Sequence, residues 1–170
     1  MAGGKYIPIA GNIGAGKTEL TEFLRRRYGL EACFEPNEAN PYLADFYGDM
    51  KTWAYRSQMF FLVRKFGLHL QLRHEKRSVV QDRTIYEDAE IFARNLHLQR
   101  LIDRRDFAVY WELYRTMSTA LRPPDLLIQL RCPVRTLRQR IRGRGREMEQ
   151  DIPPNYLRRL NRLYEDWFAS

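Results

Sequence analysis

The chain has 170 residues, which is enough for one domain with a hydrophobic core. Its formal charge is +8, and no apolar run approaches the roughly 20 residues that a membrane-spanning helix needs, so the composition argues against a helical membrane protein. The N-terminus lacks the apolar region of a signal peptide, and Cys33 and Cys132 stand in apolar, strand-like surroundings. We therefore expect one cytoplasmic domain over residues 1–170, with buried thiols and no disulfide framework.

The first predicted element is a short buried strand at residues 7–10, in which Pro8 is expected to form a bulge because proline cannot donate in a sheet. The chain then carries a phosphate-loop pattern of eight residues: Gly11, Asn12, Ile13, Gly14, Ala15, Gly16, Lys17 and Thr18. Glycine lets backbone N–H groups approach a triphosphate, and the next helix presents its positive end to the phosphates. Lys17 can reach the β- and γ-phosphates, and Thr18 can bind Mg²⁺.

Three more apolar segments, at residues 31–34, 78–81 and 126–130, predict further buried strands. Helical patterns separate them and cover residues 19–27, 53–72, 86–101, 106–122, a short stretch from 134, and a last helix that starts at 152–154. A glycine-punctuated arginine segment at residues 142–146 is expected to end the short helix and to move. The alternation of strands and helices predicts an α/β fold with a parallel sheet covered by helices.

Charged residues follow the predicted strands, at the sheet edge where ligands bind in such folds. Glu35 follows the second strand and can accept a proton from an attacking hydroxyl. Asp82 and Arg83 follow the third strand. Asp82 can hold Mg²⁺ opposite Thr18, and Arg83 can neutralise charge between the γ-phosphate and the acceptor oxygen. The arginines at 142–146 can close over the triphosphate, so these residues together predict phosphoryl transfer.

These motifs resemble the deoxynucleoside kinase family, in particular its bacterial deoxyadenosine and deoxyguanosine kinases, which are related to deoxycytidine kinase. The resemblance extends over nearly the whole chain and is carried by the phosphate loop and by residues 34–36, 40–47, 57–59, 82–88 and 141–150. It implies a three-layer P-loop kinase fold, Mg²⁺, ATP as donor, a deoxynucleoside as acceptor and a homodimer. Relatives of this kind continue into a fifth strand, which we expect to be missing from this chain.

The resemblance also implies roles for single residues around the sugar and the reacting oxygen. Glu35 would be the catalytic carboxylate beside the 5′-hydroxyl, and Arg83 would contact both. Lys17 would act on the phosphates as the third catalytic residue. Tyr47 and Glu149 would bind the 3′-hydroxyl, and Tyr47 would fill the space where a 2′-hydroxyl would point, which favours deoxyribose.

At the base, the resemblance implies that Gln58 pairs with the ring through its amide and that Asp88 lies at the base edge. Phe92 is one helical turn beyond Asp88 and could pack on the base from the same face. A glutamine amide can pair with purines or with cytosine, so the amide alone leaves the base open. The closer likeness to the bacterial relatives implies deoxyadenosine or deoxyguanosine, with deoxycytidine as the alternative. The lid at about residues 140–150 would place three arginines on the phosphates: Arg140, Arg144 and Arg146.

Two other functions fit part of this pattern. A nucleoside monophosphate kinase of the thymidylate kinase type shares the loop and the lid, but it needs a second phosphate site at the acceptor. A nucleic-acid-binding NTPase would account for the net charge of +8. The arginine-rich run lacks the interleaved aromatic residues of a base-stacking surface, so we expect no nucleic-acid partner.

Overall fold

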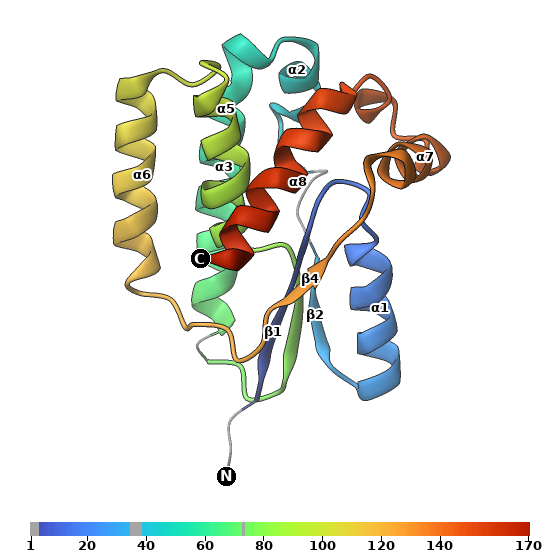
Figure 1. Ribbon diagram of the computed structural model, residues 1–170. Coiled ribbons are helices and arrows are strands. Elements are labelled where there is room, and N and C mark those ends of the chain that lie inside the picture. Colours follow the sequence, from blue (N-terminus) through green and yellow to red (C-terminus); the bar gives the residue numbers. More distant parts are fainter. Residues whose placement is uncertain (1–3, 35–38, 73) are drawn as a thin grey trace.

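The computed structural model describes residues 4–34, 39–72 and 74–170. A parallel four-stranded sheet lies at its centre (Figure 1). The strand order is β2-β3-β1-β4. The strands are β1 (Tyr6–Gly11), β2 (Glu31–Cys33), β3 (Val79–Asp82) and β4 (Ile128–Leu130). These bounds overlap all four predicted strands, and the parallel pairing confirms the predicted α/β fold.

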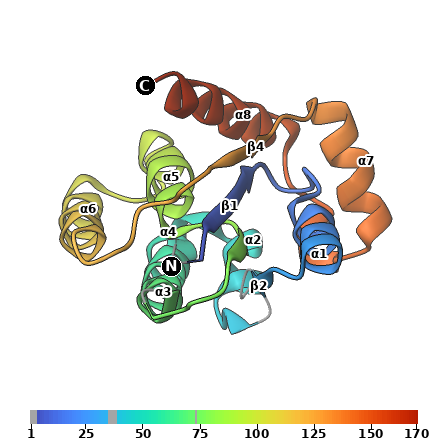
Figure 2. The same cartoon turned by 90° about the horizontal axis from the view of Figure 1, so that it is seen from below.

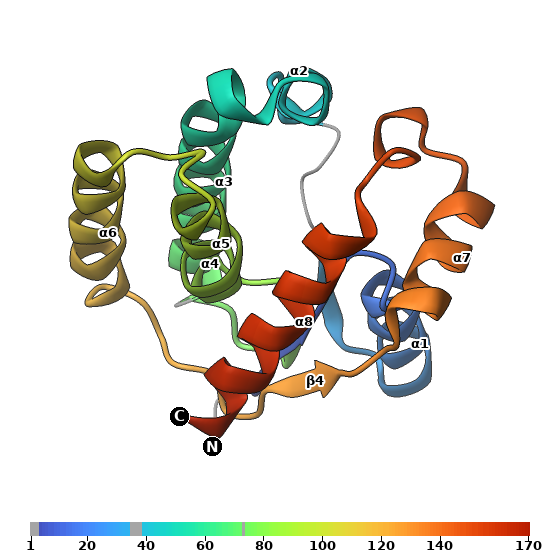
Figure 3. The same ribbon diagram turned by 45° about the horizontal axis from the view of Figure 1, so that its top comes forward.

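Helices cover both faces of the sheet, which gives three layers (Figure 2). One face carries α1 (Lys17–Tyr28) and α7 (Val134–Arg144), and the other carries α3 (Met50–Leu72), α5 (Arg94–Leu98) and α6 (Arg104–Ser118). The chain also forms α2 (Leu43–Gly48), α4 (Ile85–Glu87) and α8 (Pro154–Ala169). Helix α8 crosses between the α5 side and α7 and contacts both (Figure 3). None of the described helices is long and apolar enough to cross a membrane.

The prediction of a bulge at Pro8 is wrong. Pro8 pairs in regular register with Gln81, and its neighbour Ile9 pairs with Asp82 on β3 and with Ile128 on β4. The Ile9 carbonyl accepts from the Arg83 N–H, so Ile9 bonds towards β3 and the nitrogen of Pro8 faces β4. The pairing with β4 begins only at Ile9, so the missing donor of proline costs no ladder hydrogen bond.

Two helix predictions also need correction. The single helix expected at residues 86–101 is split into α4, a π-helical segment η2 (Asp88–Ala93) and α5. Such π segments are rare and are frequently found at functional sites. The short helix α7 does not end before residue 142, but runs through Gly143 to Arg144 and stops at Gly145 with a left-handed φ of 72°. A short 3₁₀ turn, η3 (Glu147–Glu149), follows it.

The main core lies at the carboxyl ends of the strands and joins the phosphate loop to α8. Ile13 of the loop and Leu137 of α7 are buried in the same cluster as Leu157 and Leu160 of α8. The loop end of the sheet is therefore held by packing on α7 and α8, and this packing fixes the position of the site.

The two cysteines are free and half-buried, not fully buried as predicted.

Candidate active site

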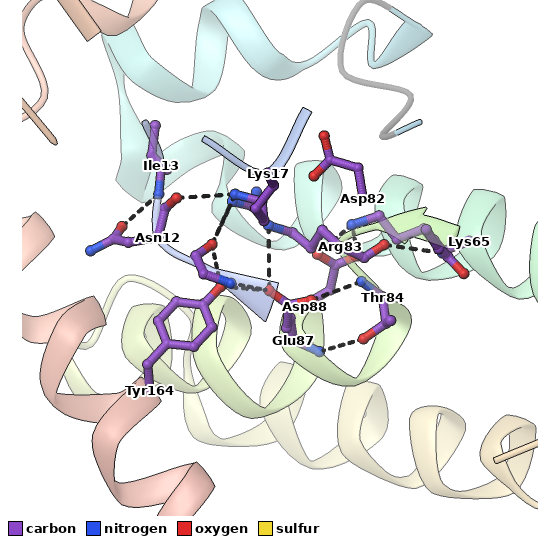
Figure 4. A network of polar contacts seen from close by, with 12 residues as sticks. Asn12, Ile13, Lys17, Lys65, Asp82, Arg83, Thr84, Glu87, Asp88 and Tyr164 are labelled. Atoms are coloured by element: carbon purple, nitrogen blue, oxygen red, sulfur yellow. Dashed lines mark hydrogen bonds and ion pairs between the residues drawn. The ribbon is translucent and has the colours of Figure 1, made fainter. Parts of the chain in front are cut away.

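The phosphate loop joins β1 to α1 and is shaped by its glycines. Gly14 and Gly16 have φ values of 77° and 97°, which residues with a side chain rarely adopt. A Cβ at Gly14 would also lie 3.1 Å from the Leu137 carbonyl oxygen. The Lys17 side chain is buried, and its Nζ donates to the carbonyl oxygens of Gly11 at 2.9 Å and Asn12 at 3.0 Å (Figure 4). The lysine thus lies against the loop whose bound phosphates it is expected to contact.

Thr18 and Asp82 meet at the head of α1 and the end of β3, as the sequence predicted. The Thr18 hydroxyl donates to Asp82 Oδ2 at 2.6 Å. Among the described residues, the other carboxylate oxygen, Oδ1, is buried without a hydrogen-bond partner. A buried carboxylate oxygen normally has a partner, and oxygen ligands of this kind are the ones that Mg²⁺ prefers. The pair therefore fits a magnesium ion.

Arg83 follows β3 in an unusual backbone conformation. Its φ of 61° lies in the left-handed region, which costs a non-glycine residue about 1–3 kcal/mol. The surroundings hold it there, because its N–H donates to the Ile9 carbonyl at 3.1 Å and its carbonyl accepts from Gln81 Nε2 at 3.0 Å. Its guanidinium lies 4.4 Å from the centroid of the Phe92 ring, and Nη2 donates to the Gly11 carbonyl at 3.3 Å. The arginine is thereby directed at the phosphate loop.

A buried polar cluster supports the Gln81 side chain that holds Arg83. Tyr6 donates its hydroxyl proton to Gln81 Oε1 at 2.7 Å, and Gln81 Nε2 lies 3.1 Å from His69 Nε2. Burial, assisted by the charge of Lys65, lowers the pKa of His69 to about 3. The neutral ring can therefore accept the second N–H of the Gln81 amide. Nothing in the sequence marked Gln81 as a functional residue.

The residues expected at the base are buried on α3 and η2. Lys65 and Asp88 form an ion pair at 2.8 Å, with side chains that are 0% and 4% exposed. Gln58 is also buried, and its Oε1 has no hydrogen-bond partner in the part of the chain that the structure describes. Phe92 packs against Arg83. Of the residues expected at the base, Phe92 thus adjoins Arg83, and the set comes from two helical segments, α3 and η2.

A cavity of about 660 Å³ opens at the phosphate loop. Tyr47, Glu149 and Lys17 line it, and the three expected lid arginines line it as well. Its lining comprises Ile13, Gly14, Ala15, Gly16, Lys17, Thr18, Glu19, Leu20, Tyr47, Asp82, Arg83, Leu130, Arg140, Arg144, Arg146 and Glu149. Most of the predicted site thus faces one space. Gln58, Asp88 and Phe92 are not among the residues that line it.

The lid arginines are tied to the cavity wall by specific contacts. Arg140 Nη1 donates to the Ala15 carbonyl at 2.9 Å. Arg144 donates to Glu149, and Arg146 Nη1 lies 3.4 Å from the same carboxylate. These contacts hold guanidinium groups at the cavity, where they can neutralise a bound triphosphate.

Glu35, the predicted catalytic carboxylate, lies outside the described residues. Sequence reasoning missed another carboxylate, Glu87, which is fully buried between the phosphate loop and the Arg83 turn. Burial raises the pKa of Glu87, while the charges of Arg83 and Lys17 oppose the shift. A signal for it was present, because Thr84 and Glu87 have the spacing of a capping box, and the structure forms that box.

Comparisons with known proteins agree with this geometry. The model of the deoxynucleoside kinase family matches residues 7–170. The deoxyadenosine kinase of Dictyostelium discoideum is 38% identical over 167 residues, which cover 98% of this chain and 68% of that protein. The deoxyadenosine/deoxycytidine kinase of Bacillus subtilis (strain 168) is 35% identical over 166 residues, which cover 96% and 76% of the two chains.

A solved structure shows the same fold. The deoxyadenosine kinase from M. mycoides with bound dATP superposes with a TM-score of 0.88 at 30% identity, and the match covers 98% of this chain and 84% of that one. This neighbour confirms the predicted P-loop kinase fold of a parallel sheet flanked by helices. The chain therefore belongs to the deoxynucleoside kinase family and is a phosphotransferase.

Proposed function

We propose that this enzyme transfers the γ-phosphoryl group of ATP to the 5′-hydroxyl of a purine deoxynucleoside, with deoxycytidine as a second acceptor. One observation carries the proposal: Lys17, the Thr18–Asp82 pair and Arg83 share a single cavity with three lid arginines. The names of the similar proteins support the choice of acceptor. The proteins from Dictyostelium discoideum and M. mycoides are named deoxyadenosine kinases, and the protein from Bacillus subtilis is named deoxyadenosine/deoxycytidine kinase.

The donor half of the site comprises the loop and the lid. The backbone from Gly11 to Gly16 and the Lys17 ammonium would bind the phosphates, and Lys17 would turn from the loop carbonyls to the β- and γ-phosphates. Thr18 and Asp82 would hold Mg²⁺, which, when bound, neutralises charge on the phosphate oxygens. The lid would add positive charge at the transferring group through Arg140, Arg144 and Arg146.

The acceptor half combines the sugar and base residues. Glu35 would accept the proton of the 5′-hydroxyl as it attacks, and Arg83 would orient that hydroxyl and balance the developing charge. Tyr47 and Glu149 line the cavity and would bind the 3′-hydroxyl. Three buried residues would contact the base: Gln58, Asp88 and Phe92.

Substituting Glu35→Gln tests the catalytic assignment. The amide keeps the size of the side chain but cannot take up the proton, so kcat should fall by about 10²–10⁴-fold while the affinity for the deoxynucleoside changes little. Glu31→Gln is the matched control, because Glu31 lies on β2, four residues earlier in the sequence, and pairs with Arg77 at the surface. Near-wild-type turnover of the Glu35 variant would show that this carboxylate is not the base.

The acceptor is identified by measuring turnover with the four deoxynucleosides and with their 5′-monophosphates. Deoxyadenosine or deoxyguanosine should give the highest kcat/KM, and the monophosphates should give none. A preference for monophosphates would favour a kinase of the thymidylate kinase type instead.

We further propose that residues 1–170 act as one domain, with a lid at about 140–150, in a cytoplasmic homodimer without a nucleic-acid partner. Sedimentation of the purified protein measures the oligomeric state.

A further inference from the structure

Glu87 lies at the junction of the two halves of the site. Its side chain extends from α4 into the interior and is 0% exposed. Oε1 accepts from the Gly11 N–H at 3.1 Å and from the Tyr164 hydroxyl at 2.8 Å, and Oε2 accepts from the Thr84 N–H at 3.0 Å. Arg83 Nε lies 3.9 Å from Oε1. Figure 4 shows Arg83, Thr84 and Tyr164 around Glu87.

The four groups belong to segments that are far apart in the sequence. Gly11 opens the phosphate loop, whereas Arg83 and Thr84 form the turn after β3, and Tyr164 lies on α8. The Gly11 peptide is held at both of its polar groups. Its N–H donates to Glu87, and its carbonyl accepts from Arg83 Nη2 at 3.3 Å. The same carbonyl lies 2.9 Å from the Tyr164 hydroxyl, whose single proton is shared between this oxygen and Glu87 Oε1.

A single carboxylate thus connects the backbone of the donor loop to the arginine of the acceptor half. The N–H groups of Gly11 and Thr84 both depend on it, and a buried N–H that loses its acceptor is unfavourable, so the backbone would move to find another. Movement at Thr84 would displace Arg83, whose left-handed backbone is sustained only by its neighbours. Displacements of about 1 Å at reacting groups can lower rates by about 10²-fold.

We propose that Glu87 is a positioning residue for phosphoryl transfer, which holds the Arg83 turn and the first glycine of the phosphate loop at a fixed separation. The inference rests on the proposed function, in which Arg83 and Lys17 act on the acceptor hydroxyl and the phosphates. Glu87 itself contacts neither substrate, because it is enclosed by protein groups. Its contribution is made through Arg83 and Gly11.

The test compares two carboxylates that each accept from a tyrosine hydroxyl. Glu87→Gln leaves one acceptor oxygen, so the amide N–H₂ must face either Gly11 or Thr84, and the charge beside Arg83 is lost. Glu90→Gln is the matched control, since Glu90 accepts from Tyr114 at 3.3 Å on the adjoining η2 segment. We expect kcat of Glu87→Gln to fall about tenfold or more with both KM values changed less than about threefold, and Glu90→Gln to stay within about twofold of wild type.

The split between kcat and KM separates positioning from stability, since a purely structural role would lower the folded fraction and leave kcat per folded molecule unchanged. Folding is checked by circular dichroism and thermal unfolding. A folded Glu87→Gln enzyme with kcat within about twofold of wild type would overturn the inference, as would an equal loss in Glu90→Gln.

If Glu87→Gln does not fold, the tyrosine partners decide the question. Tyr164→Phe removes one donor from Glu87 and should lower kcat about threefold or more, whereas Tyr114→Phe should not; equal values for the two would overturn the inference. The same assay also tests the proposed function separately. A wild-type enzyme that phosphorylates no deoxynucleoside refutes the proposed function, whereas an active wild type with an unaffected Glu87 variant refutes only the role of Glu87.

Discussion

Mild acid should destabilise this protein through the single buried histidine His69. The ring lies on α3 with Nε2 3.2 Å from the Tyr6 hydroxyl and 3.1 Å from Gln81 Nε2. The Tyr86 ring packs against it in a T-shaped arrangement, with the ring centroids 5.8 Å apart. Burial is the main cause that lowers its pKa to about 3, and the nearby ammonium of Lys65 adds to the shift. No carboxylate faces the ring in these contacts, so protonation within the fold has no compensating partner.

The direction of this pH effect depends on whether the folded or the unfolded chain binds the proton at the higher pH. An unfolded histidine has a pKa of about 6.5, so between that value and about 3 the unfolded chain takes up a proton that the folded chain does not. The free energy of unfolding should therefore decrease as the pH falls below about 6.5. For these two pKa values the loss from His69 between pH 7 and pH 5 is about 2 kcal/mol.

Urea unfolding at pH 7 and pH 5 measures this loss in the wild type, in His69→Gln and in the exposed control His74→Gln. Glutamine can place an acceptor where the ring nitrogen was, and it does not titrate. His69→Gln should thus lose about 2 kcal/mol less than wild type over this pH interval, while His74→Gln should behave like wild type. A pH dependence of His69→Gln that matches wild type within about 0.5 kcal/mol would refute the reasoning.

Three further substitutions test the site. Asp82→Asn should raise the Mg²⁺ concentration at half-maximal turnover by about 10–100-fold, because a carboxylate ligand is lost, and an unchanged midpoint in a Mg²⁺ titration would contradict the assignment. Gln81→Met keeps the bulk of the side chain but frees the Arg83 carbonyl, so kcat should fall about threefold to tenfold in steady-state assays, and an unchanged kcat would show that Arg83 does not need this support. Glu149→Gln should raise KM for the deoxynucleoside more than KM for ATP, since the proposed contact is with the 3′-hydroxyl; the opposite order would assign Glu149 to the lid alone.

The sequence predicted the elements whose causes are local. The four strands are short apolar runs, and the phosphate loop is defined by glycines at positions that need a positive φ, so both could be read directly. The location of Asp82 and Arg83 could also be predicted from the sequence, because they follow a strand and therefore had to lie at the carboxyl edge of the sheet. Their proximity to Thr18 and Lys17 is a consequence of parallel pairing between β1 and β3.

Features that depend on partners distant in the sequence were missed. Nothing local marks η2 as π-helical, because its backbone is settled by packing against α3 and α8. Pro8 was expected to disturb β1, but the disturbance depends on which neighbour its nitrogen faces, and that is a property of the whole sheet. The capping pattern of Thr84 and Glu87 was readable, yet the link from Glu87 to Gly11 was not.

The sequence by itself determined the family, the chemistry of the donor loop and the positions along the chain of the strands that precede the charged residues, because these follow from residue types and short spacings. The tertiary structure decided which of these groups touch. It joined Gly11 to Glu87 and Tyr164 across 76 and 153 positions of chain, and it held Arg83 in a left-handed turn that its own sequence does not favour. The physical reason is that buried polar groups must find partners, and only the folded chain determines which partners are within reach.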